Sequence, residues 1–387
     1  MSNLLLIAGN NSHIFKNLIY SLTRKGHSIT LLKFKNKPMS IDVWKFNKSV
    51  KIKALDQNMA ISQELITEIR NNKYDFILWD EDVVMKKFSQ EYSNVELWNL
   101  ILPIRNQNFR KMLGSKIGQA EVFDELYIRQ PRYEALFSNS ELNCKSKNLF
   151  DHYLLKGDSF AGGDAIMEVT NLSKSEKLVV PEIWFPVLCQ EFILGETISI
   201  DAIYKDGQLV AWCYSLTLTE SHRFGPSIVR KYISPKDKEF VKDLVKIGQQ
   251  SQLNGFVNIT YIKSFKDNQL YLIEFDTRPN LWHHLLFEFG FQPNNNQTTK
   301  LNSSKFGPDY SLIYEPFRLF SKSLSEFRLL LSLKVLLKRK IPGYGVPAPS
   351  AFYTKYFFPK NCLKLLFSPL LIFRALLIRN LSSLLTR

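Results

Sequence analysis

Residues 272–280, Leu-Ile-Glu-Phe-Asp-Thr-Arg-Pro-Asn, carry the strongest indication of fold in this chain. The apolar start predicts a strand that delivers Glu274, Asp276 and Arg278, and alternation along a strand would place all three side chains on one face. Two carboxylates there suit Mg²⁺, with Mn²⁺ as an alternative, because Mg²⁺ takes one or two carboxylates plus substrate phosphates. Arg278 would then stabilise charge on a transferred phosphoryl group. The competing interpretation is an exposed, salt-bridged strand end.

A glycine-rich loop lies upstream of this segment. Lys156 ends an expected strand, and the loop after it contains Gly157, Gly162 and Gly163. Glycine lets backbone N–H groups approach a phosphate closely, and a lysine adds a compact positive charge. The pattern fits a phosphate clamp, and the competing interpretation is an ordinary glycine-rich hairpin turn.

A third segment lies between these two in the sequence. Gln190, Glu191, Phe192 and Ile193 read as a strand that ends just before Gly195. Free backbone groups at a strand edge can bind adenine through main-chain hydrogen bonds while apolar side chains enclose the ring. Taken alone, the segment is equally compatible with an ordinary strand.

The N-terminal region predicts a small parallel α/β unit. Apolar strands are expected at 4–8, 28–34 and 76–79, with a helix to about residue 25 between the first two. The first loop contains one glycine rather than the Gly-x-Gly-x-x-Gly set, so a dinucleotide site is not favoured there.

Composition limits the remaining possibilities. A chain of 387 residues with 45% hydrophobic and 22% charged residues predicts a folded protein of two or three domains. The four cysteines lie far apart, which argues against a zinc site or a disulfide scaffold and favours a reducing, cytoplasmic environment. No signal peptide is expected, since the opening apolar run is short and lacks a basic leader.

The positive charge is concentrated near the C-terminus. Residues 321–387 contain twelve Lys or Arg and one acid, so they contribute +11 of the net charge of +15. Leucines mix with basic residues at 326–340 and 361–380, which fits helices lying on an anionic membrane surface, at the inner face of the membrane. The equally weighted alternative is a helix packed on the core with its charges in solvent. No motif indicates nucleic-acid binding.

The order and spacing of these segments over roughly residues 1–290 resemble the ATP-grasp superfamily of carboxylate–amine ligases. The resemblance implies an α/β and α+β fold: a Rossmann-like pre-ATP-grasp domain (1–115), two lobes that grip ATP (116–188 and 189–295) and a basic helical extension (296–387). Lys116 and Lys156 would contact phosphate, Gln190 to Ile193 would be the adenine hinge, and Glu196 lies near the expected ribose-binding position. Glu274 and Asp276 would hold magnesium. The family pattern has asparagine at position 276, and Thr260 stands where an earlier metal ligand is expected.

The implied reaction activates a small-molecule carboxylate as an acyl phosphate, which an amine then converts to an amide. Arg223 and Arg230 are candidate anchors for a substrate carboxylate, or else surface charges. Two other functions stay open. A two-lobed glycosyltransferase would suit the first 35 residues, and a degenerate ATP-grasp scaffold at a membrane surface would explain Thr260.

Overall fold

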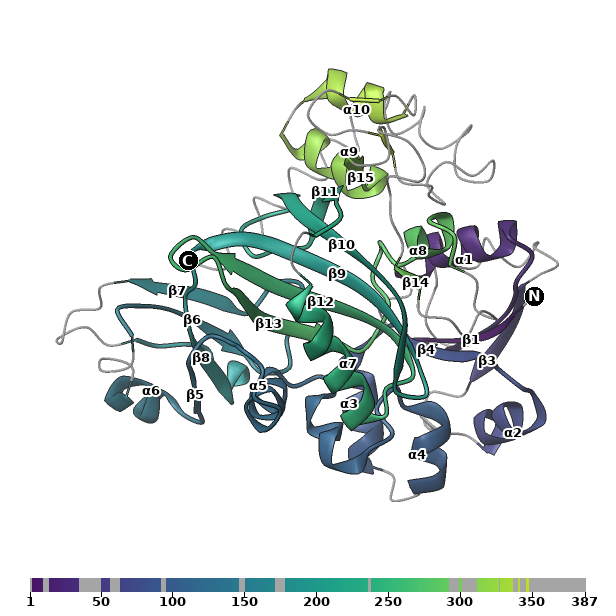
Figure 1. Ribbon diagram of the computed structural model, residues 1–387, viewed down its shortest axis with the longest axis horizontal. Helices are drawn as coiled ribbons and strands as arrows, with labels where there is room; N and C mark the ends of the chain where they lie inside the picture. Colours follow the sequence, from purple (N-terminus) through teal and green to yellow (C-terminus); the bar gives the residue numbers. More distant parts are fainter. Residues whose placement is uncertain are drawn as a thin grey trace.

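The structure is a computed structural model of the chain, drawn as a ribbon in Figure 1. It describes residues 2–9, 14–34, 50–55, 63–91, 95–145, 150–170, 178–235, 238–291, 299–300, 312–326, 328–336, 340–341 and 346–347. Within these residues the strands form a parallel sheet, a small antiparallel sheet and a large, mainly antiparallel sheet.

The parallel sheet is N-terminal and confirms the expected α/β unit. Its strands, in the order β3-β2-β1-β4, are β1 (Asn3–Ala8), β2 (Ser28–Phe34), β3 (Val50–Leu55) and β4 (Phe76–Trp79). Its helices are α1 (Phe15–Arg24), α2 (Gln63–Asn71), α3 (Asp82–Glu91) and α4 (Val95–Ile101). Leu4, Leu5 and Leu6 are fully buried, as expected for a parallel strand covered on both faces. Strand β3 was not predicted, although the alternation of Lys51 and Lys53 with apolar residues is typical of an exposed edge strand.

The small sheet carries the glycine loop. Its strands, in the order β5-β8-β6-β7, are β5 (Tyr133–Leu136), β6 (His152–Gly157), β7 (Ile166–Thr170) and β8 (Val187–Glu191). Short helices accompany it: η3 (Gln107–Met112), α5 (Lys116–Glu125), α6 (Asn139–Lys145) and η5 (Glu182–Trp184). The loop spans 158–165 between β6 and β7, and in Figure 1 this sheet lies below and to the left of the large one.

The large sheet follows the order β13-β12-β9-β10-β11-β15-β16, with β14 paired to β10. Its strands are β9 (Gly195–Lys205), β10 (Gln208–Glu220), β11 (Ser227–Tyr232), β12 (Gly255–Ser264), β13 (Leu270–Asp276), β14 (Thr299–Lys300), β15 (Leu312–Tyr314) and β16 (Val346–Pro347). The dipeptide Asp206-Gly207, which predicts a two-residue hairpin from sequence, joins β9 to β10 in this way, and both residues have the positive φ that such a turn requires.

The two faces of this sheet differ in chemistry. On β9, Ile198, Ile200 and Ala202 point to one face and pack in a core with Leu244 and Ile247 of α7 (Glu239–Ser251). The alternate residues of these strands point to the other face. At one end of that face Ile203 and Phe256 pack in a second core with Leu285 and Phe287 of α8 (His284–Glu288), whereas Asp201 and Asn258 further along are polar. Only the polar part of this face is therefore available for chemistry.

The described part of the C-terminal extension packs against the protein. Helices α9 (Pro316–Ser325) and α10 (Leu329–Leu336) lie beside β11 and β15 at the top of Figure 1. Leu319 and Val335 are buried in a cluster with Ile228 and Val229 of β11. This segment thus follows the packed-helix alternative, whereas residues 361–380 lie outside the described part. No helix within the described ranges is long and apolar enough to cross a membrane.

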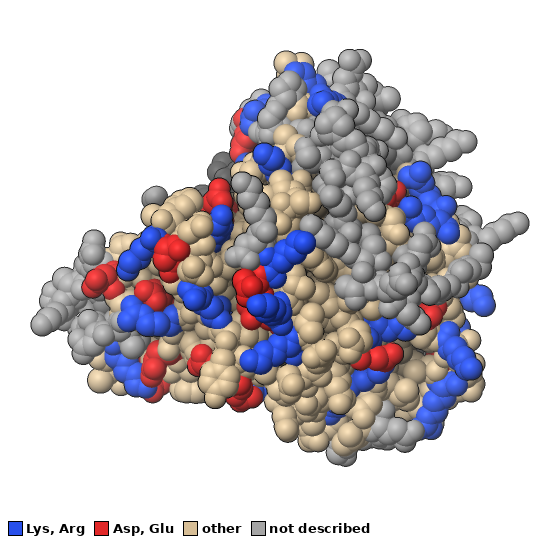
Figure 2. Space-filling view, viewed as in Figure 1, with Lys and Arg blue, Asp and Glu red and all other residues tan. Residues whose placement is uncertain are grey.

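Charge on the described surface is mixed. On the face shown in Figure 2, Lys and Arg side chains alternate with Asp and Glu and do not gather into one basic patch. The view agrees with the sequence, in which most of the excess positive charge belongs to residues after 320.

Packing of α9 can be tested by matched leucine variants. We expect Leu319→Ala, at a side chain 1% exposed, to lower the free energy of unfolding by about 2–4 kcal/mol through lost burial and a cavity. Leu330→Ala on α10, at a side chain 68% exposed, should leave it almost unchanged. Urea unfolding measures both. Equal effects of the two substitutions would contradict the packing described for α9.

Candidate active site

The candidate site lies at the end of β13, on the polar face of the large sheet. Glu274 and Asp276 both lie in this strand, and the residues opposite them on β12 are Thr260 and Asn258 respectively. Burial, followed by the charge of Asp276, raises the pKa of Glu274 above its usual value. The charge of Asp276 therefore reaches Glu274, and the nearby cations Lys116, Lys156 and Arg278 offset part of its effect.

Arg278 links this strand to the N-terminal sheet. Its Nη2 lies 3.1 Å from Oδ2 of Asp276, and its Nε lies 2.5 Å from Oδ2 of Asp82 at the start of α3. Oδ1 of Asp82 also accepts hydrogen bonds from the N–H and hydroxyl of Thr277. Burial opposes the charge of Arg278, but Asp276 and Asp82 raise its pKa above the ordinary value. Burial raises the pKa of Asp82 to about 6.

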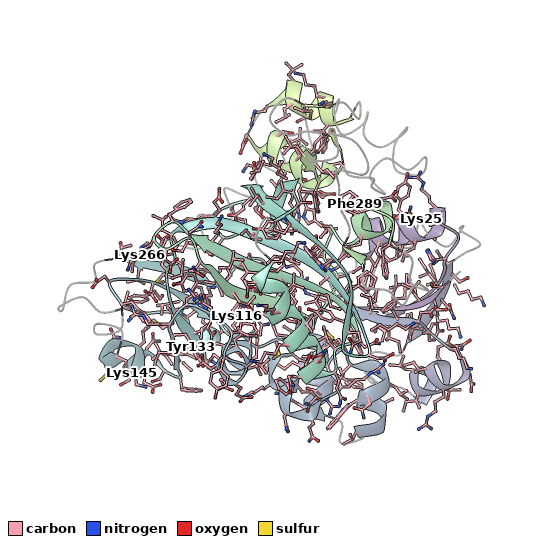
Figure 3. All side chains as sticks on the ribbon, viewed as in Figure 1. Lys25, Lys116, Tyr133, Lys145, Lys266 and Phe289 are labelled. Atoms are coloured by element: carbon pink, nitrogen blue, oxygen red, sulfur yellow. The ribbon has the colours of Figure 1, made fainter. Side chains whose placement is uncertain are left out.

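Helix α5 is fixed beside β13 by a side-chain amide. Gln119 donates to the carbonyl of Phe275 and accepts from its N–H, both at 3.0 Å. This pair satisfies backbone groups on the outer edge of the sheet, which would otherwise lack partners. The first residue of the same helix is Lys116, and Figure 3 shows it between the small and large sheets.

The glycine loop is held to α5 by Asp158. Its Oδ1 accepts from the Ile117 N–H at 2.9 Å and from the Ser115 hydroxyl at 2.8 Å, and Oδ2 accepts from Nζ of Lys86 at 2.9 Å. A carboxylate at a helix N-terminus gains from the helix dipole as well as from these bonds. Nearby, Lys116 donates to the carbonyl of Phe160 within the loop. The loop therefore closes over the start of α5.

Gly162 and Gly163 both have positive φ, at 71° and 84°. A Cβ on Gly163 would lie 2.5 Å from the carbonyl oxygen of Phe224, whereas a Cβ on Gly162 would meet nothing within 4 Å. Gly163 is thus required by close contact with the β10–β11 loop as well as by its backbone conformation.

Lys156 is buried on β6 and donates to Oε1 of Gln190 on β8 at 2.7 Å. Burial lowers its pKa to about 8, with a smaller lowering by Lys116 and an opposing effect of Glu274. The three side chains expected from the sequence near phosphate and metal, Lys116, Lys156 and Glu274, therefore lie within electrostatic reach of one another.

The expected hinge residues lie at the end of β8 and directly after it. Glu191 forms a two-point ion pair with Arg132 at 2.9 and 3.0 Å, and the Phe192 ring stacks on His152 at 4.0 Å between centroids. Ile193 is half-buried and Glu196 is exposed at the start of β9. Gln190 is the member of this group whose side chain contacts another candidate residue, Lys156. The adenine and ribose roles stay predictions.

The two candidate substrate arginines occupy different surroundings. Arg230 is 3% exposed and pairs with the fully buried Asp201 at 2.8 Å. Arg223 is an exposed side chain that pairs with Glu168 on β7 and so joins the β10–β11 loop to the small sheet. Their roles toward a substrate stay predictions.

A cavity of about 260 Å³ brings the charged residues together. Its charged lining includes Glu81, Asp82, Glu274 and Asp276 together with Lys116 and Arg278. Among the described residues, no group of three or more His, Cys, Asp or Glu forms a candidate metal site. A pair of carboxylates suits Mg²⁺, because that ion keeps several waters and takes further oxygen ligands from substrate phosphates.

Three acids of the cavity lining, Glu81, Asp82 and Asp158, were missed in the sequence, and Asp82 and Asp158 make the contacts described above. Asp82 follows β4 in the run Trp79-Asp80-Glu81-Asp82, and acids at the carboxyl end of a parallel strand are a signal for a site. Asp158 lies inside the glycine loop, where the expectation considered only the glycines and Lys156. Both reach the site from elements distant from 272–280 in the chain.

The lowered pKa of Lys156 predicts a pH-dependent stability. Between about pH 8 and pH 10.5 the unfolded chain keeps a proton that the folded protein has lost, so this group makes stability rise with pH. Lys156→Met should remove this rise in stability. The free energy of unfolding of the wild type should therefore increase relative to that of the variant as the pH goes from about 8 to 10.5. Lys266→Met, at an exposed lysine, should keep the wild-type slope. Parallel slopes for wild type and Lys156→Met would show that Lys156 titrates normally.

Comparisons with known proteins agree with this arrangement. No protein-family model matches the chain. A carbamoyl-phosphate synthase from Methanobrevibacter smithii is 26% identical over 191 residues, which cover 46% of this chain and 50% of that protein. The match thus spans about half the length of that relative.

Solved structures share more of the architecture. An L-amino acid ligase from Bacillus licheniformis is 14% identical, with a TM-score of 0.51 over 72% of this chain and 67% of that one. The biotin carboxylase domain of the Hydrogenobacter thermophilus 2-oxoglutarate carboxylase, solved with MgADP and bicarbonate, is also 14% identical, with a TM-score of 0.52 over 76% and 71%. The three sheets, the glycine loop and the charged cavity together match the architecture of these structures. The chain has the ATP-grasp fold.

Proposed function

We propose that the protein is an ATP-dependent carboxylate–amine ligase that forms an amide through an acyl phosphate. The observation that carries this proposal is the convergence of Glu274, Asp276 and Arg278 with Lys116 at one cavity. These are the groups that phosphoryl transfer needs for charge neutralisation, and they come from both lobes of the fold.

The reaction has two balanced steps. A carboxylate oxygen of the acid attacks the γ-phosphorus of ATP, the bond to the β,γ-bridging oxygen breaks, and ADP leaves. An amine nitrogen then attacks the carbonyl carbon of the acyl phosphate, inorganic phosphate leaves with the former carboxylate oxygen, and the amine loses a proton. Both steps depend on holding reactants in position and on offsetting negative charge.

The lysines and the loop would hold the nucleotide. Lys116 and Lys156 supply positive charge for the phosphates, and the loop containing Gly162 and Gly163 supplies backbone N–H groups. Gln190, Glu191, Phe192 and Ile193 would bind adenine, and Glu196 the ribose. Because Lys116 donates to the Phe160 carbonyl, nucleotide binding would exchange this contact for phosphate oxygens.

Glu274 and Asp276 would hold magnesium, and Asp276 also pairs with Arg278. When bound, the ion supplies charge neutralisation between phosphate oxygens. Arg278, kept charged by Asp82 and Asp276, would donate to the equatorial oxygens of the transferring phosphoryl group. The raised pKa of Glu274, caused by burial and by the charge of Asp276, supports a cation at this pair.

The proposal predicts a large effect of one neutral substitution. Phosphate release would be measured with Mg²⁺ and ATP against a panel of amino acids and other carboxylates. With an acid that stimulates turnover, Glu274→Gln should lower kcat/KM by roughly 100-fold or more, because a charged ligand near the transferring group is lost.

Glu239→Gln is the matched control, since that glutamate is exposed on α7, away from the cavity. It should keep wild-type turnover, and melting temperatures should verify that both variants fold. Wild-type turnover by the folded Glu274→Gln protein would refute the assignment of Glu274.

A nucleotide-protection experiment separates the ligase from the two alternatives. ATP with Mg²⁺ should raise the melting temperature, whereas sugar nucleotides should have little effect, because the charged cavity suits a triphosphate and a metal. Strong protection by sugar nucleotides would favour the glycosyltransferase. Protection by neither would favour a degenerate scaffold, for which Thr260 opposite Glu274 is the supporting observation.

Association of the basic residues 361–380 with an anionic membrane surface, at the cytoplasmic face, is also part of this proposal. Its support is compositional: leucines interleaved with Lys and Arg, and no acid in this segment.

A further inference from the structure

Two arginines outside the proposed nucleotide site meet on one residue of β11. Arg230 donates from Nε to the Ser227 hydroxyl at 2.8 Å. Arg318, in the first turn of α9, donates from Nη1 to the carbonyl of the same Ser227 at 3.0 Å. The packed C-terminal extension thus brings a guanidinium next to the candidate substrate arginine.

The two guanidinium groups differ in how their charge is balanced. Arg230 pairs with Asp201, which lies on the polar face of the large sheet. Arg318 has no ion pair within 4 Å among the described residues, and its guanidinium bond goes to a neutral carbonyl. Glu315 contributes attraction, but its Oε2 accepts from the Arg318 backbone N–H at the start of α9. A half-buried arginine without a paired carboxylate is costly unless an anion joins it.

Neighbouring cations add to this imbalance. Burial lowers the pKa of Arg318 to about 10, Glu315 raises it, and the charges of Arg230 and Arg278 lower it further. Lys16, in the first turn of α1, is also electrostatically coupled to Glu315. The charges of Arg230 and Arg278 therefore reach Arg318, and Glu315 attracts both Lys16 and Arg318.

This region is connected to the reacting centre by hydrogen bonds. Asp201 accepts from Arg230 at 2.8 Å and from the Asn280 amide at 3.0 Å, and the same amide donates to Asn258. Asn258 lies opposite Asp276 in the strand register. Asp201 and Asp276 are two strands apart, roughly 10 Å at about 4.8 Å per strand, which is the length of a small metabolite.

We propose that Arg318, with Arg230, forms an anion subsite for a second acidic group of the substrate, a carboxylate or a phosphate. This inference rests on the proposed ligase function and names its substrate class: a molecule whose reacting group lies near Arg278 and whose other anionic end is bound by the extension. Arg318 acts by a charge-assisted, two-point contact of the kind that guanidinium makes with oxyanions.

The test is isothermal titration of the full chain with two probes, inorganic phosphate and succinate, in the presence of a non-hydrolysable ATP analogue and Mg²⁺, so that the phosphate sites of the nucleotide are filled. The wild type should bind at least one probe, and the probe that binds distinguishes phosphate from carboxylate recognition. Arg318→Ala should weaken this binding about tenfold or more, and Arg318→Lys less, because lysine keeps the charge and loses the two-point contact.

Arg328→Ala is the matched control, because Arg328 is an exposed arginine of the same extension that pairs with Glu326. It should bind the probes as the wild type does, and both alanine variants should bind the nucleotide analogue normally. Equal probe binding by Arg318→Ala and Arg328→Ala, or no probe binding to the wild type, would overturn the subsite. Failure of the proposed ligase function is a separate result, since the nucleotide analogue itself would then give no binding heat.

Discussion

The ion pairs of Arg278 with Asp82 and Asp276 are the contacts on which the candidate site depends. They join the carboxyl end of a parallel strand in the N-terminal sheet to the last strand of the large sheet. Thr277 adds two hydrogen bonds to the same Asp82 carboxylate. Because these charges are largely withdrawn from water, each depends on the others, and loss of one partner would leave a buried charge unpaired.

Near these ion pairs, the small sheet is positioned by polar side chains that form hydrogen bonds with otherwise unpaired backbone groups. Gln119 pairs with both backbone groups of Phe275, and Asp158 caps the start of α5. These bonds add to the apolar contact that Val122 and Phe123 of α5 make with Phe275 in the core. The glycine loop itself is held to α5 by polar contacts, which fits a loop that must exchange them for a ligand.

The C-terminal extension also packs on the large sheet. Its apolar face completes a core with β11, while its first turn directs Arg318 toward Ser227 and Arg230. The extension therefore contributes both an apolar face and a basic side chain to the protein. In the described part, burial of Leu319 and Val335 decides the helix packing, and Arg318 donates to the Ser227 carbonyl of β11.

Sequence alone determined the local helices and strands and the order of the candidate site residues along the chain. The alternation of Glu274, Phe275 and Asp276 predicted a strand end with two acids on one face, and the hairpin at Asp206-Gly207 followed from turn chemistry. The register shift before this strand end, which turns Leu272 into the core with Phe275, was not predicted. Tertiary structure decided which distant groups meet there. Asp82 lies 195 positions before Thr277, and no local pattern records that pairing, because loop closure and sheet order bring the two together. The partners of Arg278 and the inward turn of Arg318 follow from packing, since a charged side chain's surroundings are set by whichever elements bury it.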